Sequence, residues 1–538
     1  MTEALGSAKP IGAGVSPAPR PSDSLAKNSV ISGIAAIATN LAGFLSTVIV
    51  ARLVGVEGTG VVSFAAAIAT ITIAVFDLGI QTTLTRFVPE VEINSGEGRA
   101  QDLVWYLMRI FVALNLVLFL GLVGIGIYLA LVEGHAANWI TADNFRSNPL
   151  FWSILGAFCL IQAMAFFETA YLKGRQRFRL LSLISLVSMA AQLTGVLVAT
   201  ALYGVTGALL GAFLGPAYLA LRALRHRPRP RAPAPELRTR VLRFSAYTLA
   251  GQVLATLMTT RLEVVFLDAF WGSHPVGLFT VSLTLANMAC VPMFLCTALL
   301  PHVSSFTGDE ASTRLNETYR YSMRLLALIV LPGCFGLAAI TPGFLPAIYG
   351  REFSDAVPSA MLLITFSACI TMSTVPTTFL LAREESRLVM MTSAIGAALT
   401  IASGLTLIPF LGTIGGAAGR ATMHAAVLAS ALYLLSSRLG CRPPISDLAR
   451  ILLAAMLCGS AALAIVLQWP GWLGIGFAIV AGVVTYGLAL RLLGALKPED
   501  AARLNRALGL LPGGLRAPGY WLFGLLTART ALNGEVVH

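Results

Sequence analysis

Long apolar stretches separated by short polar loops run through most of the chain. Two of them are SVISGIAAIATNLAGFLSTVIVA, from residue 29, and LALIVLPGCFGLAAI, from residue 326. A helix of about 20 apolar residues crosses the hydrocarbon layer of a bilayer, so the pattern predicts about fourteen transmembrane helices. Their approximate limits are 29–50, 61–85, 103–131, 151–172, 180–202, 204–224, 244–267, 277–303, 320–340, 358–382, 388–408, 414–437, 450–468 and 473–493.

The composition agrees with an all-α polytopic membrane protein. Hydrophobic residues make up 57% of the 538 residues and charged residues only 12%, whereas soluble domains carry about 25% charged residues. The formal net charge of +12 would suggest a nucleic-acid partner in a soluble protein. In a membrane protein it has another explanation, because Lys and Arg gather in cytoplasmic loops. We therefore expect no nucleic-acid partner.

The distribution of basic residues predicts the orientation. With the N-terminus in the cytoplasm, the inner loops hold KGRQRFR (173–179), RALRHRPRPRAPAPELRTRVLR (222–243) and AREESR (382–387). The outer loops hold only Arg52, Arg146 and Arg351. Both termini are then cytoplasmic. The polar residues 1–28 lack the features of a cleavable signal peptide, so the first span is expected to be retained.

Four pairs of similar segments divide the chain into two halves. GVEGTGVVSFAAAIA, from Gly55, aligns with GSHPVGLFTVSLTLA, from Gly272, and YLMRIFVAL (106–114) aligns with YSMRLLALI (321–329). The segment from Tyr171 to Arg179 aligns with that from Phe379 to Arg387, and YGVTGALLG (203–211) has the glycine spacing of LGTIGGAAG (411–419). Four pairs of similar segments in the same order indicate an internal duplication. An even number of spans in each copy gives both the same orientation, a parallel repeat.

The expected organisation follows from the spans and the repeat. It comprises a disordered cytoplasmic tail (1–28), an N-lobe of helices 1–6 (29–224), a basic Pro-rich cytoplasmic linker (225–243), a C-lobe of helices 7–12 (244–437), helices 13–14 (438–493) and a cytoplasmic amphipathic tail (494–538).

Two groups of ionisable residues fall inside predicted spans, where such residues are costly and usually face a cavity or a partner. The acids are Asp77, four residues before Gln81 on the same helix face, and Glu168. The bases include Arg420 and His424, also four apart, whose shared face would suit an anionic ligand such as a phosphate. Alternatively, Arg420 pairs with a carboxylate or extends to the surface, and His424 bonds a backbone carbonyl.

Two further arginines lie toward the outer ends of spans. Arg261 could line a cavity, extend to the surface, or pair with Asp268, whereas Glu263 is expected to point elsewhere. Arg52 is either a gate residue or an ordinary interfacial arginine.

The repeat separates the two kinds of charge. Arg420 aligns with Ala212, His424 with Pro216, and Asp77 with the region of Pro292. The N-terminal copy thus holds buried acids and the C-terminal copy buried bases, which makes these unshared charges the better candidates for substrate or ion handling.

No enzyme, cofactor or metal motif is apparent. The sequence has no Walker loop, G-x-S-x-G, H-E-x-x-H or EF-hand loop. The six histidines lack metal-ligand spacing and the seven cysteines contain no C-x-x-C, so the cysteines are expected to be buried apolar residues.

The first helical hairpin resembles that of bacterial polysaccharide and O-antigen flippases, within the multidrug/oligosaccharidyl-lipid/polysaccharide exporter (MOP) superfamily. The pattern A-R-L-x-G-x-x-G-x-G, then D-L-G-[IL]-x-x-x-L-x-R, is met by Ala51, Arg52, Leu53, Gly55, Gly58, Gly60, Asp77, Leu78, Gly79, Ile80, Leu84 and Arg86. Two six-helix lobes followed by two further helices also match. The second hairpin departs from the pattern, because Arg261-Leu262-Glu263 replaces an arrangement with Asp at the third position.

The resemblance implies a flippase of the bacterial inner membrane, not an enzyme. It would translocate undecaprenyl-diphosphate-linked oligosaccharide for surface polysaccharides such as O-antigen or exopolysaccharide, by alternating access of the lobes around a cationic cavity. Arg261 and Arg420 would attract the diphosphate, with His424 and Arg52 in the same cavity. Asp77 and Glu168 would couple transport to H⁺ or Na⁺ without a cofactor. Membrane lipids and a polysaccharide polymerase or export machinery would be partners.

Several other functions stay open at this stage. A lipid II flippase shares the number of spans. A drug/cation antiporter of the same superfamily would more typically end after about twelve spans and favour an acidic cavity. A membrane glycosyltransferase or polymerase would need a large outer loop, which the sequence lacks, and a scaffolding role is a further alternative.

Overall fold

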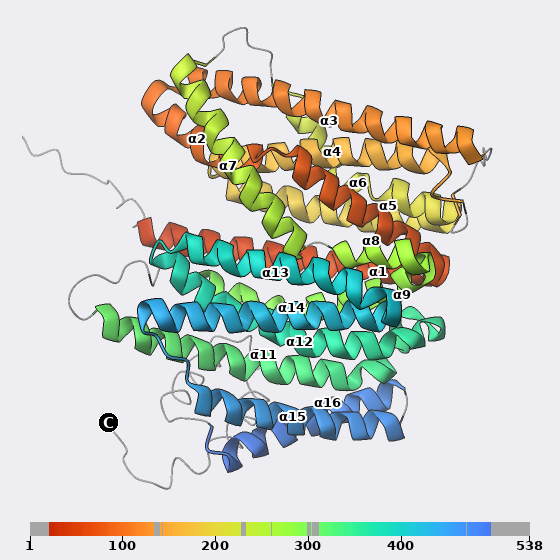
Figure 1. Cartoon of the computed structure of the whole chain (residues 1–538), viewed down its shortest axis with the longest axis vertical. Coiled ribbons are helices and arrows are strands. Elements are labelled where there is room, and N and C mark those ends of the chain that lie inside the picture. The colour runs from red at the N-terminus through yellow and green to blue at the C-terminus, as the bar shows by residue number, and fades with distance from the viewer. Residues whose placement is uncertain are drawn as a thin grey trace, which may run out of the picture.

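The computed structural model describes residues 21–133, 140–141, 144–226, 233–259, 261–298, 303, 311–469 and 471–495. Within these ranges the regular structure is helical, and most helices lie side by side in a stack (Figure 1). The first part of the predicted N-terminal tail and nearly all of the predicted C-terminal tail lie outside the described residues. Residues 21–28 are already helical, so the first helix begins earlier than the apolar pattern predicted.

The N-terminal half contains six helices. They are α1 (Pro21–Phe76), α2 (Ile80–Ser95), α3 (Glu97–Glu133), α4 (Pro149–Gly174), α5 (Phe178–Gly211) and α6 (Leu214–Ala223). Helix α1 is bent at Gly55, whose φ of 69° and ψ of −169° are not helical. The second predicted span does not reach residue 85, because the chain turns at Leu78 and Gly79, which have positive φ.

The C-terminal half is built similarly, with two further helices at its end. Its elements are α7 (Pro235–Thr259), α8 (Leu262–Trp271), α9 (Ser273–Ala289), the 3₁₀ helices η1 (Val291–Ala298) and η2 (Arg351–Ala356), α11 (Ala311–Tyr349), α12 (Val357–Ala382), α13 (Ser386–Thr406), α14 (Ile408–Leu439), α15 (Ile445–Gln468) and α16 (Trp472–Leu492). Part of the predicted linker is therefore helical. A proline suits the first helical position, and Glu236 in the first turn complements the helix dipole.

The backbone repeats the sequence duplication. Gly55 (φ 69°, ψ −169°) and Gly272 (φ 81°, ψ −168°) have nearly the same conformation. Gly204 (φ 56°, ψ −132°) matches Gly412 (φ 53°, ψ −126°). Even the non-glycine positions Gln176 and Glu384 share a positive φ, of 54° and 62°. The two halves thus turn at equivalent places, which confirms the two-repeat fold.

Ten stretches of the described residues are long and apolar enough to cross a membrane. Two of them, Ile37–Phe76 and Phe178–Ala223, each cover most of two spans predicted from the sequence. Helix α14 and the pair α7–α8 are not among the ten. Helix α8 has only 10 residues, because the chain breaks before Leu262. Helix α14 carries Arg420 and His424 within its predicted span.

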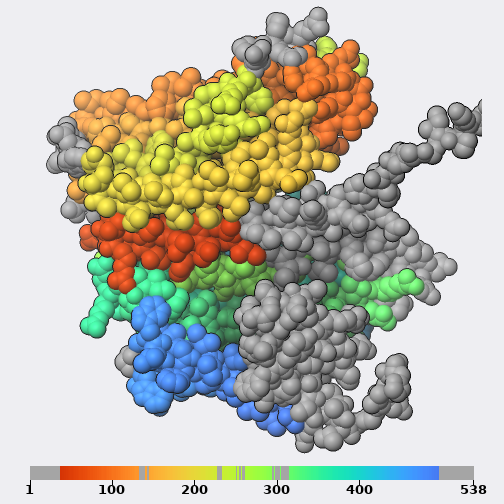
Figure 2. All heavy atoms as spheres, turned by 180° about the vertical axis from the view of Figure 1, so that it is seen from behind, coloured from red at the N-terminus to blue at the C-terminus, as the bar shows by residue number. Residues whose placement is uncertain are grey.

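The halves meet where α1 crosses α9. Gly60 and Gly277 occupy equivalent repeat positions, and a Cβ on either would lie about 2 Å from a carbonyl oxygen of the opposite helix, at Ser273 and Val56 respectively. Only glycine permits this approach of the two backbones. Figure 2 shows α1 as a red band between the yellow helices of the N-terminal half and the green and blue helices of the C-terminal half.

The stack has two ends, which are named here by a residue at each. The Gly55 end contains the bends at Gly55 and Gly272 and the α3–α4 connection. The opposite end, called the Arg175 end, contains the α2–α3, α4–α5 and α12–α13 turns (Figure 1). Most of the candidate charges lie either between the halves or at one of these ends.

Candidate functional site

Arg261 lies in the break between α7 and α8, at the boundary between the halves. It precedes the first residue of α8 and its backbone is not helical (φ −75°, ψ 49°). Its Nη1 donates to the hydroxyl of Ser63 in α1, at 3.2 Å. The same hydroxyl accepts a 2.6 Å hydrogen bond from Thr280 of α9, the residue equivalent to Ser63 in the repeat. The helix break thus directs a guanidinium from the C-terminal half against the N-terminal half.

Arg420 forms a buried ion pair with Glu263. Its Nε and Nη2 donate to the two carboxylate oxygens at 2.9 and 2.8 Å, in a bidentate arrangement. Both side chains are less than 10% exposed. The structure therefore has the carboxylate pair that was one alternative for Arg420. It also corrects the expectation that Glu263 points away, because the start of α8 faces α14.

His424 lies one helical turn beyond Arg420 and is buried. Its Nδ1 has no hydrogen-bond partner among the described residues. The hydroxyl of Tyr349, which is within electrostatic reach of Arg261, is likewise buried without a described partner. These two atoms are the kind of buried polar group that a ligand or water satisfies.

We call Arg261, Glu263, Tyr349, Arg420 and His424 the junction cluster. Its members come from α8 and its preceding break, α11 and α14, and they lie beside α1 through Ser63. The carboxylate of Glu263 neutralises Arg420, which leaves Arg261 as the cation of the cluster with no ion pair among the described residues. Arg261 and Arg420 are also close enough to repel each other. The cluster therefore presents excess positive charge between the two halves.

Arg52 lies at the Gly55 end and not within the junction cluster. Its Nε and Nη2 donate to the carbonyl oxygens of Ile348 and Ala347, at 2.6 and 2.5 Å. These carbonyls are at the C-terminal end of α11, where carbonyl groups lack helical partners and cations are favoured. Arg52 thus joins α1 of one half to α11 of the other.

A second contact between the halves at this end was not anticipated. Arg146, in the connection before α4, binds the carboxylate of Asp268 at 2.8 Å and its backbone oxygen at 2.6 Å. The alternative pairing of Asp268 with Arg261 is therefore wrong. Asp268 lies near the end of α8 and faces the α3–α4 connection, whereas Arg261 lies before its first turn.

Asp77 is buried in the turn between α1 and α2, not in the middle of a span. It accepts a 3.0 Å hydrogen bond from the side-chain amide of Gln81, which confirms that these two residues share a face. Within the described part of the chain, no hydrogen bond or ion pair joins Asp77 to the junction cluster. The next residues pack against α7, where the Ser245 hydroxyl donates to the carbonyl of Leu78 at 2.7 Å.

Glu168 is fully engaged by bases at the Arg175 end. Arg222 Nε donates to one carboxylate oxygen at 2.6 Å, and His226 Nε2 lies 2.8 Å from the other. Glu168 is almost fully buried, so loss of either base would leave its charge poorly compensated. Its contacts with Arg222 and His226 join α4 to α6 and to the chain that follows α6. The predicted division into acidic and basic halves is therefore weaker than the sequence suggested, since Arg420 pairs with an acid of its own half and Glu168 is bound by two bases.

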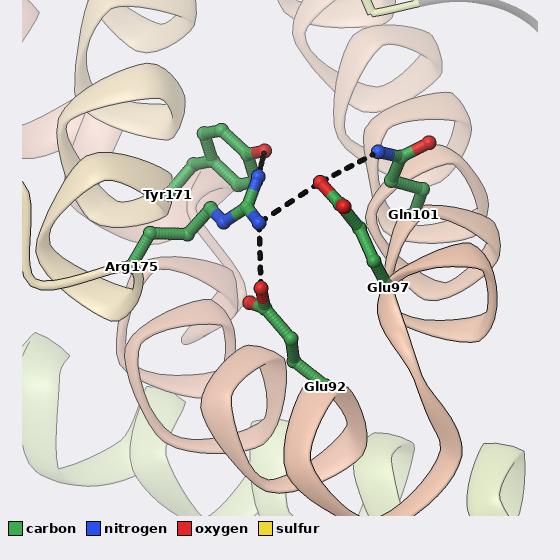
Figure 3. A network of polar contacts seen from close by, with 5 residues as sticks. All are labelled: Glu92, Glu97, Gln101, Tyr171 and Arg175. Carbon is green, nitrogen blue, oxygen red and sulfur yellow. Dashed lines mark hydrogen bonds and ion pairs between the residues drawn. The ribbon is translucent and has the colours of Figure 1, made fainter. Parts of the chain in front are cut away.

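A network around Arg175 also joins helices at this end (Figure 3). Arg175 Nη2 contacts Glu92 at 2.5 Å and Glu97 at 2.9 Å, and Nη1 donates to the Tyr171 hydroxyl at 3.1 Å. The hydrogen bond to Glu92 raises the pKa of the Arg175 guanidinium above its ordinary value. The network fixes the α2–α3 turn to the end of α4 and is structural.

Two hollows lie along membrane-spanning helices. One lies between α11, α15 and α16, has a volume of about 380 Å³, and is lined almost entirely by apolar residues such as Leu337, Ile340 and Val483. The other lies along α3 and is considered below. No group of three His, Cys, Asp or Glu side chains suited to a metal gathers in the described part of the chain.

The arrangement of two bent, equivalent helical halves around a charged junction defines a polytopic membrane protein with a transporter-like fold. Among solved structures, "Lipid II flippase MurJ, inward closed conformation" is similar with a TM-score of 0.68 and 14% identity, over 86% of this chain and 98% of that one. An inward-facing multidrug MATE transporter of the MOP superfamily gives a TM-score of 0.60 and 13% identity, over 74% and 94%. A MOP superfamily transporter from Pyrococcus furiosus gives 0.54 and 13%, over 78% and 96%.

The family model described as "Polysaccharide biosynthesis protein" matches residues 49–358. The chain belongs to this family, and the resemblance first recognised in the hairpin of residues 51–91 is confirmed. No curated protein matches the sequence. The matched region begins just before Arg52, includes Arg261 and Glu263, and ends before α14, which supplies Arg420 and His424.

Proposed function

We propose that the protein is a flippase for undecaprenyl-diphosphate-linked oligosaccharide in the bacterial inner membrane, serving surface polysaccharide synthesis. Membership of the polysaccharide biosynthesis family and the fold it shares with a lipid II flippase support this proposal. The observation that carries it is Arg261, a cation in a helix break between the two halves that has no ion pair among the described residues. The same cluster holds polar atoms of His424 and Tyr349 that also have no described partner.

Arg261 is the proposed diphosphate-binding residue. A guanidinium matches phosphate oxygens through paired N–H donors, and in a region of low dielectric such hydrogen bonds are strong. His424 Nδ1 and the Tyr349 hydroxyl, which have no hydrogen-bond partner among the described residues, would add polar contacts to the same head group. Arg420, already held by Glu263, would act by positioning α8 and raising the local potential. Arg52, engaged at the Gly55 end, would act as a gate residue.

The proposed cycle opens the two ends in turn. We infer that the Gly55 end faces outward and that both termini are cytoplasmic, because the basic loops lie at the Arg175 end. In this structure the outer end is closed by Arg52, by Arg146 with Asp268, and by the glycine contacts between α1 and α9. Substrate would bind from the cytoplasm, and separation of α1 from α9 would release it outside. The apolar hollow beside α15 and α16 would suit part of the lipid tail.

We propose that Asp77 is a better candidate for ion coupling than Glu168. Asp77 accepts a hydrogen bond from the Gln81 side-chain amide and lies in a turn where α2 meets α7, an element of the other half, so its protonation or Na⁺ binding could alter a contact between halves. Glu168 is held by two bases within one half, which gives it less freedom to exchange a cation.

The decisive cellular experiment removes the gene and measures the sidedness of lipid-linked oligosaccharide. We expect accumulation on the cytoplasmic side, loss of a surface polysaccharide, and rescue by the wild-type gene. Arg261→Lys should restore part of the transport and Arg261→Ala none, while the surface control Arg351→Ala should restore all of it. Unchanged glycan with raised sensitivity to cationic drugs would contradict the proposal and favour an antiporter.

Lipid II is the second candidate substrate, because the structural likeness includes a lipid II flippase. Rescue of a strain depleted of its lipid II flippase would favour this substrate. If the gene does not restore growth of that depleted strain, the surface-polysaccharide precursor stays the proposed substrate. We also propose a polysaccharide polymerase or export machinery as a partner, because the family takes part in polysaccharide biosynthesis.

A further inference from the structure

The two copies of one arginine have different surroundings. Arg109 in α3 and Arg324 in α11 occupy equivalent positions of the repeat, in YLMRIFVAL and YSMRLLALI. Arg324 is buried and pairs with Asp447 of α15, with Nε and Oδ2 3.2 Å apart. Arg109 is exposed and forms no ion pair with any described residue. Comparison of the two copies therefore shows that Arg109 lacks the acidic partner that Arg324 has in Asp447.

The difference arises because α15 and α16 cover only one copy. Helix α11 packs against both of these helices, whereas α3 packs chiefly on α4 and α2. Figure 1 shows α3 at one edge of the stack, at the opposite side from α15 and α16. Of the most apolar part of each span, 28% is buried in α3 and 44% in α11. One face of α3 thus lacks the protein cover that its counterpart has.

A groove of about 870 Å³ lies along this part of α3. Near the Arg175 end it is lined by Trp105, Tyr106, Arg109 and Arg238, and the Arg238 guanidinium lies 5.6 Å from the centre of the Tyr106 ring. Leu116, seven residues beyond Arg109 and about 10 Å further along the helix, lines the apolar continuation. Two cations and two aromatic rings at one end, with aliphatic side chains beyond them, match an amphiphile with an anionic head.

We propose that this groove binds an anionic phospholipid of the bilayer, with its phosphate between Arg109 and Arg238 and an acyl chain along α3 toward Leu116. The lipid would supply to Arg109 the negative charge that Asp447 supplies to Arg324. A phospholipid fits better than a protein partner because the groove runs along a membrane-spanning helix, and tryptophan and tyrosine at one end are typical of the depth of lipid head groups. The site does not depend on what the protein transports.

The test measures lipid retention by the purified full-length protein. Native mass spectrometry with added dioleoylphosphatidylglycerol or dioleoylphosphatidylcholine should show preferential retention of phosphatidylglycerol. A charge-assisted hydrogen bond to phosphate is worth about tenfold or more in affinity, so Arg109→Ala should lower this retention about tenfold and Arg238→Ala similarly. Arg109→Lys should keep part of it. Arg179→Ala, an exposed arginine at the same end but outside the groove, should keep all of it.

The steric variant Ala113→Trp keeps both cations but fills the apolar part of the groove, and it should also lower phosphatidylglycerol retention. Normal elution on gel filtration checks the fold of each variant. Equal retention of both lipids, or unchanged retention in Arg109→Ala, would overturn the proposal. So would extraction of a polyprenyl phosphate in place of a phospholipid, or an acidic protein bound through Arg109 while lipid retention stays unchanged.

Discussion

Arg261 and Arg420 carry the same charge, but their different surroundings suit them to different roles. Arg420 is held by both oxygens of Glu263, so its charge is neutralised inside the protein. Among the described residues, Arg261 has the hydroxyl of Ser63 as its hydrogen-bond partner and forms no ion pair. An anion would therefore gain more from Arg261, while Arg420 chiefly sets the position of α8.

At this scale we predict that breaking the buried pair destabilises the protein. Arg420→Ala leaves the carboxylate of Glu263 buried without its partner, which costs about 3–5 kcal/mol of the free energy of unfolding. Thermal unfolding in detergent should show a clearly lower midpoint. The double variant Arg420→Met with Glu263→Leu should recover most of the midpoint, because neither charge remains. A midpoint for Arg420→Ala equal to that of the wild type would contradict the importance of the pair.

Helix α1 depends on glycine at two places with different requirements. Gly55 supplies the positive φ of the bend, and Gly60 allows the backbone of α9 to approach. Their equivalents, Gly272 and Gly277, do the same for the other half, so the contact between α1 and α9 has the approximate twofold symmetry of the repeat.

Gly60→Ala should weaken closure of the Gly55 end. The new Cβ would lie 1.9 Å from the carbonyl oxygen of Ser273, whereas real Cβ atoms essentially never come closer than 3.0 Å, so the two helices must separate. We expect a probe cysteine near this end to react faster with a membrane-impermeant thiol reagent. Gly43→Ala, in the same helix with nothing within 4 Å, is the matched control and should react like the wild type. Equal labelling of the two variants would contradict this role of Gly60.

Hydropathy and repetition were sufficient to predict most helices, because a span needs a long apolar stretch whatever its neighbours are. The breaks at Leu78–Gly79 and before α8 were missed, since a local turn barely changes the average hydropathy. Ion-pair partners were also missed or only listed as alternatives. Arg420 and Glu263 are 157 residues apart, and which side chains meet depends on how helices cross.

The proposed cycle requires the two halves of the molecule to move apart at the Gly55 end. Three kinds of contact hold this end together: the bonds of Arg52 to α11, the Arg146–Asp268 pair, and the contact of α1 with α9. The proposed transport cycle must break these contacts and form them again.

A crosslink between the halves should therefore stop transport. Ser63 and Thr280 have their hydroxyl oxygens 2.6 Å apart across the boundary, so Ser63→Cys with Thr280→Cys should form a disulfide under oxidation. We expect the oxidised double variant to lose transport and the reductant to restore it, while each single variant responds to neither. Full transport by a protein shown to be crosslinked would mean that α1 and α9 need not separate here.

The most direct test of the central claim is flipping by the purified protein in liposomes. Undecaprenyl-diphosphate-linked oligosaccharide is placed in both leaflets, and its accessibility to an external glycan-modifying enzyme is followed over time. The account predicts that wild-type protein exposes the inner-leaflet pool, that Arg261→Lys does so more slowly, and that correctly folded Arg261→Ala does not. Exposure by Arg261→Ala at the wild-type rate, or no exposure by the wild type under an applied H⁺ or Na⁺ gradient, would contradict it.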